Sequence, residues 1–494
     1  MNIALFLEMA AEAAPERIGL VCDGRRWTYA ELLAGARGAA RSIVEAGCSH
    51  VALLDESSEA AIFALFGAAL AGVPYCPLNY RLADADLGAL LGRIAPALVI
   101  GDAARASRLC PDNLNRSRAD FVSAALAAAP LDEAADGEGI AIQLFTSGTT
   151  AAPKAAILRH ANLVSYILGT VEFACADEND AALVSVPPYH IAGISALLSS
   201  IYAQRRIVML PAFSPEAWLA LAEAEAVSNA FVVPTMLSRI LDVIERDGTA
   251  RMPALRAVAY GGGKMPFEVI DKALTRLPDV GFTNAYGLTE TSSTIALLGP
   301  EDHRVAHGST DPQVRARLAS VGRPLPTVEL EIRDEEGRVL PPGMAGEIFV
   351  RGDQVSGEYR EKSALTADGW FPTRDAGYLD AEGYLFLSGR ADDVIVRGGE
   401  NMSPGEIEDV LLTHPAIADA CAIGVPSVEW GEAVGVALVL REGHARPDDA
   451  ELCRLVRERL RSSRVPEVIR FEPALPYNEM GKLLRREVRK LFAA

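Results

Sequence analysis

Short apolar runs alternate with alanine- and leucine-rich segments of helical spacing through the first 320 or so residues. The runs with strand character are 18–22, 50–55, 97–101, 180–187 and 230–234. Thr28 and Glu31 form a capping-box spacing before one helical segment, and Glu59 to Gly72 forms another. Strands that alternate with helices predict an α/β fold with a largely parallel sheet.

The pattern changes after about residue 318. "TVELEIRDEEGRVL" alternates apolar and polar residues, and "GEIFVRG" and "GYLFLSG" follow as short strands, which predicts a small antiparallel β subdomain. Beyond Arg390, Ser403, Pro404 and Glu406 predict an N-cap, a first helical position and a capping-box partner. A strand at 433–440, a helix at 447–461 and a strand at 467–471 complete a small α+β domain.

The composition narrows the functional classes. The chain has 494 residues, half of them hydrophobic, and a net charge of −19, which argues against a basic nucleic-acid-binding surface. None of its seven cysteines forms a C-x-x-C pair, so a disulfide framework and a zinc site are poor interpretations. We expect a cytoplasmic protein without a signal peptide or a spanning helix, because the apolar stretches are short or contain prolines.

One hydroxyl-rich loop has the residue types of a phosphate-binding site. "LFTSGTTAAPK", from Leu144 to Lys154, places threonines and a serine around Gly148 before a lysine. Hydroxyls, close backbone N–H groups and a cation are typical of a phosphate site, although an ordinary surface turn has the same composition. Pro153 stands where a Walker A loop would need glycine, so that motif is excluded.

Four further motifs accompany this loop. They are "NAYGLTE" at 284–290, "GWFPTRDAGYLD" at 369–380, "GRADDVIVRGGE" at 389–400 and "LPYNEMGKLLRR" at 475–486. In this order and at these separations, the motifs resemble the adenylate-forming superfamily of acyl-CoA synthetases, aryl-CoA ligases, luciferases and peptide-synthetase adenylation domains. The resemblance covers nearly the whole chain and is greatest to fatty acyl-CoA synthetases.

The resemblance implies a reaction and a domain organisation. ATP activates a carboxylic acid as acyl-AMP with Mg²⁺, and the thiol of coenzyme A then displaces AMP. A large domain, residues 1–391, combines α/β subdomains with a small β subdomain, and a small mobile α+β domain, residues 392–494, rotates about a hinge at Asp392. The resemblance does not decide the oligomeric state, and a homodimer is one possibility.

The resemblance also implies a role for each matching residue, and the chemistry of the side chains suits these roles. Glu290 would bind Mg²⁺, Tyr286 would stack on adenine, Asp375 and Arg390 would hold the ribose and phosphate region, and Lys482 would stabilise charge during adenylation. The implied catalytic set is Lys482, Glu290, Arg390, Thr146 and His190. The implied ATP-binding set is Thr146, Ser147, Gly148, Thr149, Thr150, Lys154, Gly261, Gly262, Gly263, Asn284, Tyr286, Gly287, Thr289, Asp375, Arg390 and Lys482.

The acid site is less specific. "PPYHIAGIS" at 187–195 matches the segment that lines the acyl pocket, and His190 stands where amino-acid-activating relatives place an aspartate. An amino-acid substrate is therefore not expected, and the apolar neighbours favour a fatty acid over an aromatic acid. His190 is either a catalytic group or a packed wall residue. The acyl-binding set is His190, Ile191, Gly193, Val233 and Gly261.

The acceptor is assigned in the same way. Gly398 and Gly399 match the turn that admits pantetheine, and Trp430 matches a position that stacks on the CoA adenine, although a lone tryptophan is as often core. A ligase that loads an acyl carrier protein, an aryl-CoA ligase and a non-enzymatic nucleotide-binding relative are the alternatives.

Three residues depart from the family pattern. Ala151 and Ala155 replace two glycines of the phosphate loop, which predicts a stiffer loop if the first glycine has a positive φ. Arg374 stands where glycine is common and adds a positive charge beside the nucleotide site.

Overall fold

Parallel strands dominate two sheets in the computed structural model, which describes residues 1–131, 135–146, 153–248, 252–390, 393, 395–397, 400–477 and 483–492. The chain divides into two compact units: Met1–Leu318 with Pro324–Glu329 and Arg351–Phe371, and Ala319–Arg323 with Leu330–Val350 and Pro372–Ala494. The predicted α/β class is confirmed, with a large N-terminal part and a smaller C-terminal part.

The first unit contains both large sheets. In spatial order, the nine-stranded sheet consists of β15 (Arg323–Pro324), β14 (Ser293–Leu298), β13 (Gly281–Leu288), β12 (Ala257–Gly261), β11 (Asn229–Val232), β9 (Ala181–Val184), β10 (Arg206–Met209), β1 (Ile18–Cys22) and β2 (Arg25–Thr28). The seven-stranded sheet consists of β18 (Glu358–Tyr359), β8 (Lys154–Arg159), β7 (Ile140–Thr146), β4 (Tyr75–Pro77), β3 (His50–Leu54), β5 (Ala97–Gly101) and β6 (Leu114–Ser117).

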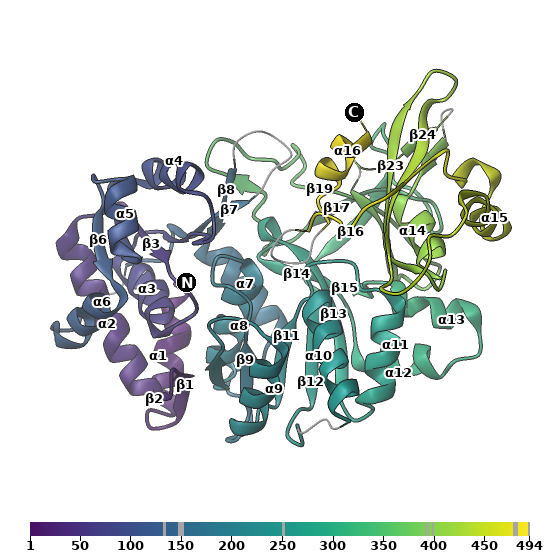
Figure 1. Cartoon of the computed structure of the whole chain (residues 1–494). Coiled ribbons are helices and arrows are strands. Elements are labelled where there is room, and N and C mark those ends of the chain that lie inside the picture. Colours follow the sequence, from purple (N-terminus) through teal and green to yellow (C-terminus); the bar gives the residue numbers. More distant parts are fainter. Residues whose placement is uncertain are drawn as a thin grey trace. The chain divides into compact units, whose positions relative to one another are not determined.

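Helices cover the faces of these sheets (Figure 1). They are α1 (Ala4–Ala13), α2 (Tyr29–Ala46), α3 (Glu59–Ala71), α4 (Asp84–Ile94), α5 (Ala103–Leu109), α6 (Arg118–Ala127), α7 (His160–Thr170), α8 (Ile191–Tyr202), α9 (Pro215–Ala224), α10 (Pro234–Asp247), α11 (Phe267–Arg276), α12 (Pro300–Gly308) and α13 (Pro312–Ala316). Short 3₁₀ turns lie at η1 (Thr289–Thr291) and η2 (Arg317–Ala319).

One buried core joins the two large sheets through the helices between them. It includes Leu20 and Ile207 of the nine-stranded sheet and Val51 and Ile142 of the seven-stranded sheet. Small residues allow α2 and α3 to pack closely, because a Cβ on Gly35 would lie 2.2 Å from the Phe63 ring. The alanine-rich composition of these segments therefore serves tight helix packing.

The second unit contains a four-stranded sheet, a mostly antiparallel five-stranded sheet and the C-terminal helices. The four-stranded sheet is β16 (Glu329–Arg333), β17 (Gly346–Arg351), β19 (Phe371–Leu379) and β20 (Leu385–Arg390). The five-stranded sheet contains β22 (Glu400–Met402), β21 (Ile395–Arg397), β24 (Gly431–Leu440) and β23 (Ile417–Ser427), with β25 (Val468–Phe471) parallel to β24. The helical segments are α14 (Pro404–Leu412), α15 (Asp449–Arg459), η4 (Ser462–Arg464) and α16 (Arg485–Phe492).

The two predicted capping boxes have different outcomes. Thr28 and Glu31 form both hydrogen bonds of the box at the start of α2, as expected. Ser403 is the N-cap residue of α14 and Pro404 its first residue, as predicted, but the Ser403 side chain makes no cap hydrogen bond, so the predicted box with Glu406 does not form. The Ser403 hydroxyl donates instead to the Ser388 carbonyl, a long-range partner that the local sequence does not reveal.

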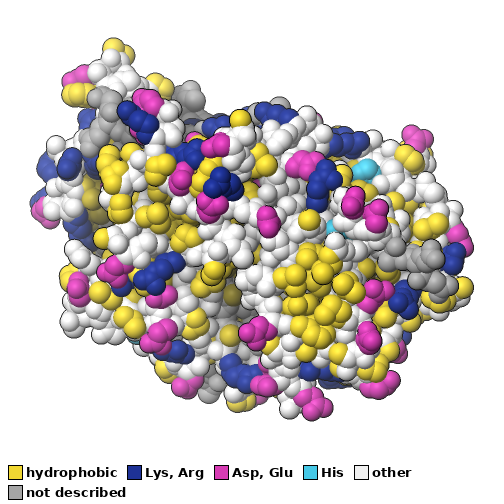
Figure 2. Space-filling model, turned by 180° about the vertical axis from the view of Figure 1, so that it is seen from behind, with side chains coloured by type: hydrophobic (Ala, Val, Ile, Leu, Met, Phe, Trp, Pro, Cys, Tyr) yellow, Lys and Arg dark blue, Asp and Glu magenta, His cyan; other side chains and the backbone are white. Residues whose placement is uncertain are grey.

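The surface carries charges of both signs. On the face in Figure 2, acidic side chains are interspersed with basic ones, and apolar side chains gather in more than one patch. Among the described residues, no helix is both long and apolar enough to span a bilayer.

Candidate active site

The residues predicted to meet adenine lie at the carboxyl ends of two neighbouring parallel strands. Gly261, the last residue of β12, pairs with Ala285 of β13, and Asn284 and Tyr286 flank that residue. A Cβ on Gly261 would lie 2.3 Å from the Ala285 carbonyl oxygen, so only glycine fits. Gly262 and Gly263 continue the chain as exposed residues, as a ligand approaching the backbone requires.

A strained turn follows β13. A Cβ on Gly287 would lie 1.7 Å from the Ser293 carbonyl oxygen, so the backbones of β13 and β14 approach closely here. Ser292 and Ser293 have φ angles of 58° and 116°, which serine rarely adopts. The half-buried Thr289 and the buried Glu290 lie in η1 between these two points. Strain of this kind concentrates at functional sites.

Tyr359 holds the carboxylate of Glu290. Its hydroxyl donates to Glu290 Oε1 at 2.6 Å, and the Glu290 carbonyl accepts from Ser356 N at 2.9 Å and Gly357 N at 3.1 Å. Glu290 is 8 % exposed, so its carboxylate lies in a fixed position with part of its surface accessible. Sequence analysis missed Tyr359, which follows Glu290 by 69 residues and belongs to none of the quoted motifs.

The hydroxyl-rich segment begins in β7 and ends in β8, two strands that pair with each other, and its last residue lies near the same tyrosine. Thr146 and Lys154 pair across the hairpin, and Lys154 Nζ lies 5.4 Å from the centre of the Tyr359 ring. Arg93 Nη1 donates to the Pro153 carbonyl at 2.6 Å and fixes the second end. Lys154 and Glu290 thus both lie at Tyr359, and Thr146 is the strand partner of Lys154.

Several predicted residues lie outside the described residues. They are Ser147, Gly148, Thr149, Thr150, Ala151, Asp392, Gly398, Gly399 and Lys482. Their assigned roles stay predictions. Ala155 is described: it is a buried residue of β8 and has no positive φ angle, so alanine fits there without strain.

His190 lies directly before α8 in a largely apolar environment. Its ring centre is 4.6 Å from that of Tyr189, and its Nε2 atom is buried without a hydrogen-bond partner among the described residues. Burial lowers the pKa of His190 to about 4, so the ring is neutral at pH 7. A neutral, unpaired ring nitrogen can donate to or accept from a bound molecule.

The other predicted acyl residues differ in what surrounds them. Ile191 is half-buried, whereas Val233 is 1 % exposed. A Cβ on Gly193 would lie 2.8 Å from the Pro187 carbonyl oxygen, so this glycine allows α8 to pack against the preceding loop. Near Gly261, Phe231 Cζ lies 3.6 Å from the position of a Cβ, and this half-buried aromatic side chain was not predicted.

A pair of hydroxyls links the acyl segment to the strained turn. Ser195 Oγ of α8 lies 3.2 Å from Ser293 Oγ and donates to the Ala192 carbonyl at 3.2 Å. Ser293 is half-buried, whereas Ser195 is 7 % exposed. Sequence reasoning missed this pair because its members are 98 residues apart.

In the second unit, Asp375 and Arg390 form an ion pair. They oppose each other across β19 and β20, with Arg390 Nη1 2.8 Å from Asp375 Oδ1. Arg390 also donates to the Thr373 carbonyl at 3.4 Å, and the Thr373 hydroxyl accepts from Asp375 N at 3.1 Å. Arg374 between them has a φ angle of 63°, which explains why glycine is common at this position in the family.

Trp430 lies on the surface between β23 and β24. It is 41 % exposed, and the Arg397 guanidinium lies 5.2 Å from its ring centre. Arg397 ends β21 and pairs with Gly431, the residue after Trp430. The surface position argues against a core role for Trp430.

Comparison with known protein families agrees with the order of the motifs and with this geometry, because two family models match the chain. A model described as AMP-binding enzyme matches residues 7–360, and one described as AMP-binding enzyme C-terminal domain matches residues 406–482. The chain belongs to the AMP-binding enzyme family. As a member of this family, it is an AMP-forming acid–thiol ligase.

Relatives of this AMP-binding enzyme include ligases for different acids. The fatty acid–[acyl-carrier-protein] ligase ScoC of Streptomyces coeruleorubidus is 32 % identical over 98 % of this chain and 95 % of the relative. The 2-succinylbenzoate–CoA ligase of Geobacillus kaustophilus is 34 % identical over 99 % of this chain and 97 % of the relative.

Solved structures agree in fold. The o-succinylbenzoate CoA synthetase of Bacillus subtilis, in complex with an acyl-adenylate intermediate, has a TM-score of 0.85 and 28 % identity, covering 98 % of this chain and 97 % of that chain. ATP-bound MatB of Rhodopseudomonas palustris has a TM-score of 0.87 and 27 % identity, covering 100 % of this chain and 99 % of that chain.

Proposed function

We propose that this AMP-binding enzyme activates a carboxylic acid with ATP and transfers the acyl group to the thiol of coenzyme A. In the first reaction, a carboxylate oxygen attacks the α-phosphorus of ATP, the bond to pyrophosphate breaks and acyl-AMP forms. In the second, the thiol sulfur attacks the acyl carbon, AMP leaves and the thiol proton passes to solvent.

The contact between Tyr359 and Glu290 carries this proposal. It brings a carboxylate near the β7–β8 hairpin, which supplies Lys154 and Thr146. A lysine and a hydroxyl suit phosphate oxygens, and a fixed carboxylate suits a divalent cation. A non-enzymatic nucleotide-binding relative would not need the predicted Lys482 in addition.

The donor set fits Mg²⁺. Among the described residues, no group of three or more His, Cys, Asp or Glu side chains could hold a metal by itself. Mg²⁺ commonly binds through one or two carboxylates together with substrate phosphates and water. Glu290 would hold it, and bound Mg²⁺ would neutralise phosphate charge. The ATP-bound MatB structure and a Bacillus subtilis o-succinylbenzoate CoA synthetase structure with ATP and a magnesium ion support this assignment.

The residues that would bind the ribose and stabilise charge during adenylation are those that the motifs imply. Asp375 would accept hydrogen bonds from the ribose hydroxyls, with its orientation held by Arg390. Lys482 would stabilise the charge that develops as pyrophosphate leaves. Asp392 would be the hinge between the proposed domains, residues 1–391 and 392–494.

For the acid, a fatty acid remains the first candidate. Tyr189 packs against His190, and Ile191 and Phe231 are half-buried apolar residues of the predicted acyl segments. The 187–195 segment contains no carboxylate that would bind a substrate ammonium. The fatty acid–[acyl-carrier-protein] ligase ScoC supports this candidate.

An aryl acid with a polar substituent is the second candidate. The Ser195–Ser293 hydroxyl pair favours it, because a half-buried hydroxyl can bind a substrate carbonyl or hydroxyl that a hydrocarbon chain lacks. Feruloyl-CoA synthase of Amycolatopsis is 31 % identical over 98 % of this chain, which supports the aryl alternative.

For the acceptor, we favour coenzyme A over a carrier protein. The exposed Trp430 ring can stack on the CoA adenine, and the nearby Arg397 can attract the phosphates of coenzyme A. The alternative acceptor is the phosphopantetheine of an acyl carrier protein.

A panel of acids tests both assignments. Pyrophosphate release is measured with acetate, fatty acids of rising length, hydroxycinnamates and amino acids, and thioester is measured with coenzyme A and a carrier protein side by side. We expect the highest kcat/KM with a medium or longer fatty acid and with coenzyme A. Highest activity with acetate or an amino acid would refute the acid assignment, and thioester on the carrier protein alone would refute the acceptor.

A further inference from the structure

A network of polar contacts holds both ends of the segment that contains Lys482. Tyr477 and Leu483 form an antiparallel bridge, and Leu484 N donates to the Pro476 carbonyl at 2.8 Å. Tyr477 and Leu483, which flank residues 478–482 in the sequence, therefore lie side by side. Leu483 is the residue after Lys482, so the backbone next to this lysine is fixed by the bridge.

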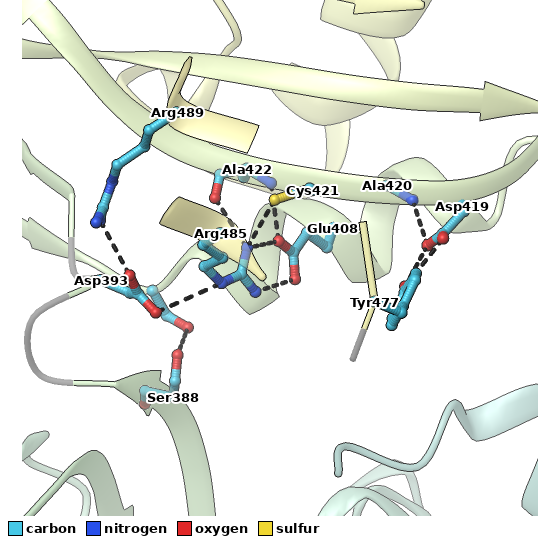
Figure 3. A network of polar contacts seen from close by, with 11 residues as sticks. Ser388, Asp393, Glu408, Asp419, Ala420, Cys421, Ala422, Tyr477, Arg485 and Arg489 are labelled. Atoms are coloured by element: carbon cyan, nitrogen blue, oxygen red, sulfur yellow. Dashed lines mark hydrogen bonds and ion pairs between the residues drawn. The ribbon is translucent and has the colours of Figure 1, made fainter. Parts of the chain in front are cut away.

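Each end is also attached to the same strand. The Tyr477 hydroxyl donates to both carboxylate oxygens of Asp419 at 3.0 and 2.9 Å. Arg485 donates to the Ala422 carbonyl at 3.0 Å. Because Asp419 and Ala422 both belong to β23, the sheet serves as a common base for the two ends of the segment (Figure 3).

Arg485 is the centre of the network. Its guanidinium binds both carboxylate oxygens of Glu408, of which the Nη2–Oε2 contact measures 2.9 Å, and Glu408 Oε1 also accepts from Ala422 N at 2.8 Å. The side chains of Arg485 and Glu408 are only 16 % and 8 % exposed. Such a bidentate pair, shielded from solvent, fixes orientation as well as position.

The network extends to the residue that follows the proposed hinge. Asp393 Oδ2 lies 3.8 Å from Arg485 Nε, and Asp393 Oδ1 lies 3.0 Å from Arg489 Nη2. Figure 3 shows Arg485 between Asp393 and Glu408. Arg485 thereby connects the residue after Asp392 to α14 and to the start of α16.

We infer that Arg485 and Glu408 are positioning residues for adenylation, which act by holding the segment of Lys482. This inference rests on the proposed role of Lys482 in the first half-reaction. Arg485 lies three residues after that lysine, and a small displacement of a catalytic group is enough to slow a reaction greatly. A role limited to stability would instead reduce both half-reactions in proportion to the folded fraction.

A second ion pair of α14, between Arg464 and Glu406, offers a matched control for the pair between Arg485 and Glu408. Arg464 Nε binds Glu406 Oε1 of α14 at 2.9 Å, and the Arg464 side chain is 13 % exposed, close to the value for Arg485. Within the part of the chain that the structure describes, Arg464 also donates to Ser463 Oγ at 2.8 Å. Arg464→Gln therefore removes a comparable ion pair of α14 and leaves the Arg485–Glu408 pair in place.

The test measures both half-reactions in wild type, Arg485→Gln, Glu408→Gln and Arg464→Gln, each normalised to its folded fraction. Pyrophosphate release in a single turnover reports adenylation, and thioester from synthetic acyl-AMP and coenzyme A reports the second step. We expect Arg485→Gln and Glu408→Gln to slow adenylation roughly 10- to 100-fold and thioester formation less than threefold. Arg464→Gln should change either rate less than threefold.

A double variant separates positioning from an independent effect. If Arg485 acts through Lys482, Lys482→Ala/Arg485→Gln is no slower in adenylation than Lys482→Ala. The inference would be overturned if the rate reductions of Lys482→Ala and Arg485→Gln multiply in the double variant. It would also be overturned if Arg485→Gln slows both half-reactions equally. If Lys482→Ala itself leaves adenylation intact, the proposed function of the lysine fails instead.

A milder variant covers the case in which Arg485→Gln does not fold. Tyr477→Phe removes only the hydroxyl that binds Asp419, at a residue that is 41 % exposed. We expect it to slow adenylation about threefold to tenfold and to leave thioester formation unchanged. An unchanged adenylation rate in Tyr477→Phe would overturn the inference.

Discussion

The hydroxyl of Tyr359 donates a 2.6 Å hydrogen bond to Glu290 Oε1, and the ring of Tyr359 lies 5.4 Å from Lys154 Nζ. One tyrosine therefore contacts the proposed metal ligand and lies against the proposed phosphate-binding lysine. Loss of a residue that holds a metal-binding carboxylate commonly weakens metal affinity about 10- to 100-fold.

Tyr359→Phe should weaken Mg²⁺ binding while keeping the ring beside Lys154. We expect the Mg²⁺ concentration for half-maximal pyrophosphate release to rise about tenfold, and Glu290→Gln to cause a larger rise. A Mg²⁺ titration of the adenylation rate measures both, with Tyr378→Phe of the second unit as the control. An unchanged Mg²⁺ requirement in both site variants would contradict the assignment of Glu290.

Arg374 should be under backbone strain, since its φ angle is 63°. Arg374→Gly and Arg374→Ala remove the same charged side chain but differ in the Cβ atom. We expect the glycine variant to be more stable than the alanine variant by about 1 kcal/mol, as measured by urea unfolding. At Glu329, an exposed strand residue without a positive φ, the order should reverse. The same order at both positions would show that φ is not the cause.

His190 should make the protein sensitive to mild acid. Its pKa falls from 6.5 to about 4 on burial, so the unfolded chain binds more protons between these values and stability falls as the pH drops through this window. From pH 7 to pH 5, this contribution is about 2 kcal/mol. His160 also has a pKa lowered to about 4 by burial, so the wild type should lose more than this amount.

The contribution of His190 is measured by comparing variants. His190→Gln should lose less unfolding free energy between pH 7 and pH 5 than wild type, whereas the same change at the exposed His444 should leave the loss unchanged. Equal pH dependence in wild type and His190→Gln would mean that the ring is not neutralised by folding.

The Ser195–Ser293 pair should decide between the candidate acids. Ser293→Ala removes a half-buried hydroxyl and keeps the Cβ, so the backbone strain is unchanged. If a polar substituent binds there, kcat/KM for a hydroxycinnamate should fall about fivefold, and kcat/KM for a fatty acid should change less than twofold. Ser199→Ala on α8 is the control. Equal effects on both acids would remove the support for an aryl substrate.

Local patterns predicted the fold well because its strands and helices are defined by their own residues. The run at 18–22 coincides with β1, and the Thr28–Glu31 capping box begins α2 as expected. At Ser403, a distant carbonyl of Ser388 overrode the local capping preference. That bond depends on two segments meeting in space, which periodicity does not report.

The site was predictable where chemistry is concentrated in short motifs. Glu290, Tyr286 and Asp375 could be selected from their motifs, whereas Tyr359, Phe231 and the Ser195–Ser293 pair could not. Each of these side chains is an ordinary residue in the sequence, and its position beside the site arises only from strand order and long-range packing. Arg374 was noticed as a departure, but its φ angle required the structure.

The strained turn at Ser292 and Ser293 has a consequence for how such an enzyme changes its substrate during evolution. Glu290, the proposed metal ligand, and Ser293, the proposed acid contact, are joined by only two residues, and the Gly287 backbone closes against this turn. An insertion or deletion there would displace both groups together. Lineages that acquire a new acid are therefore expected to exchange side chains at positions 195 and 293 and to preserve the length of the turn.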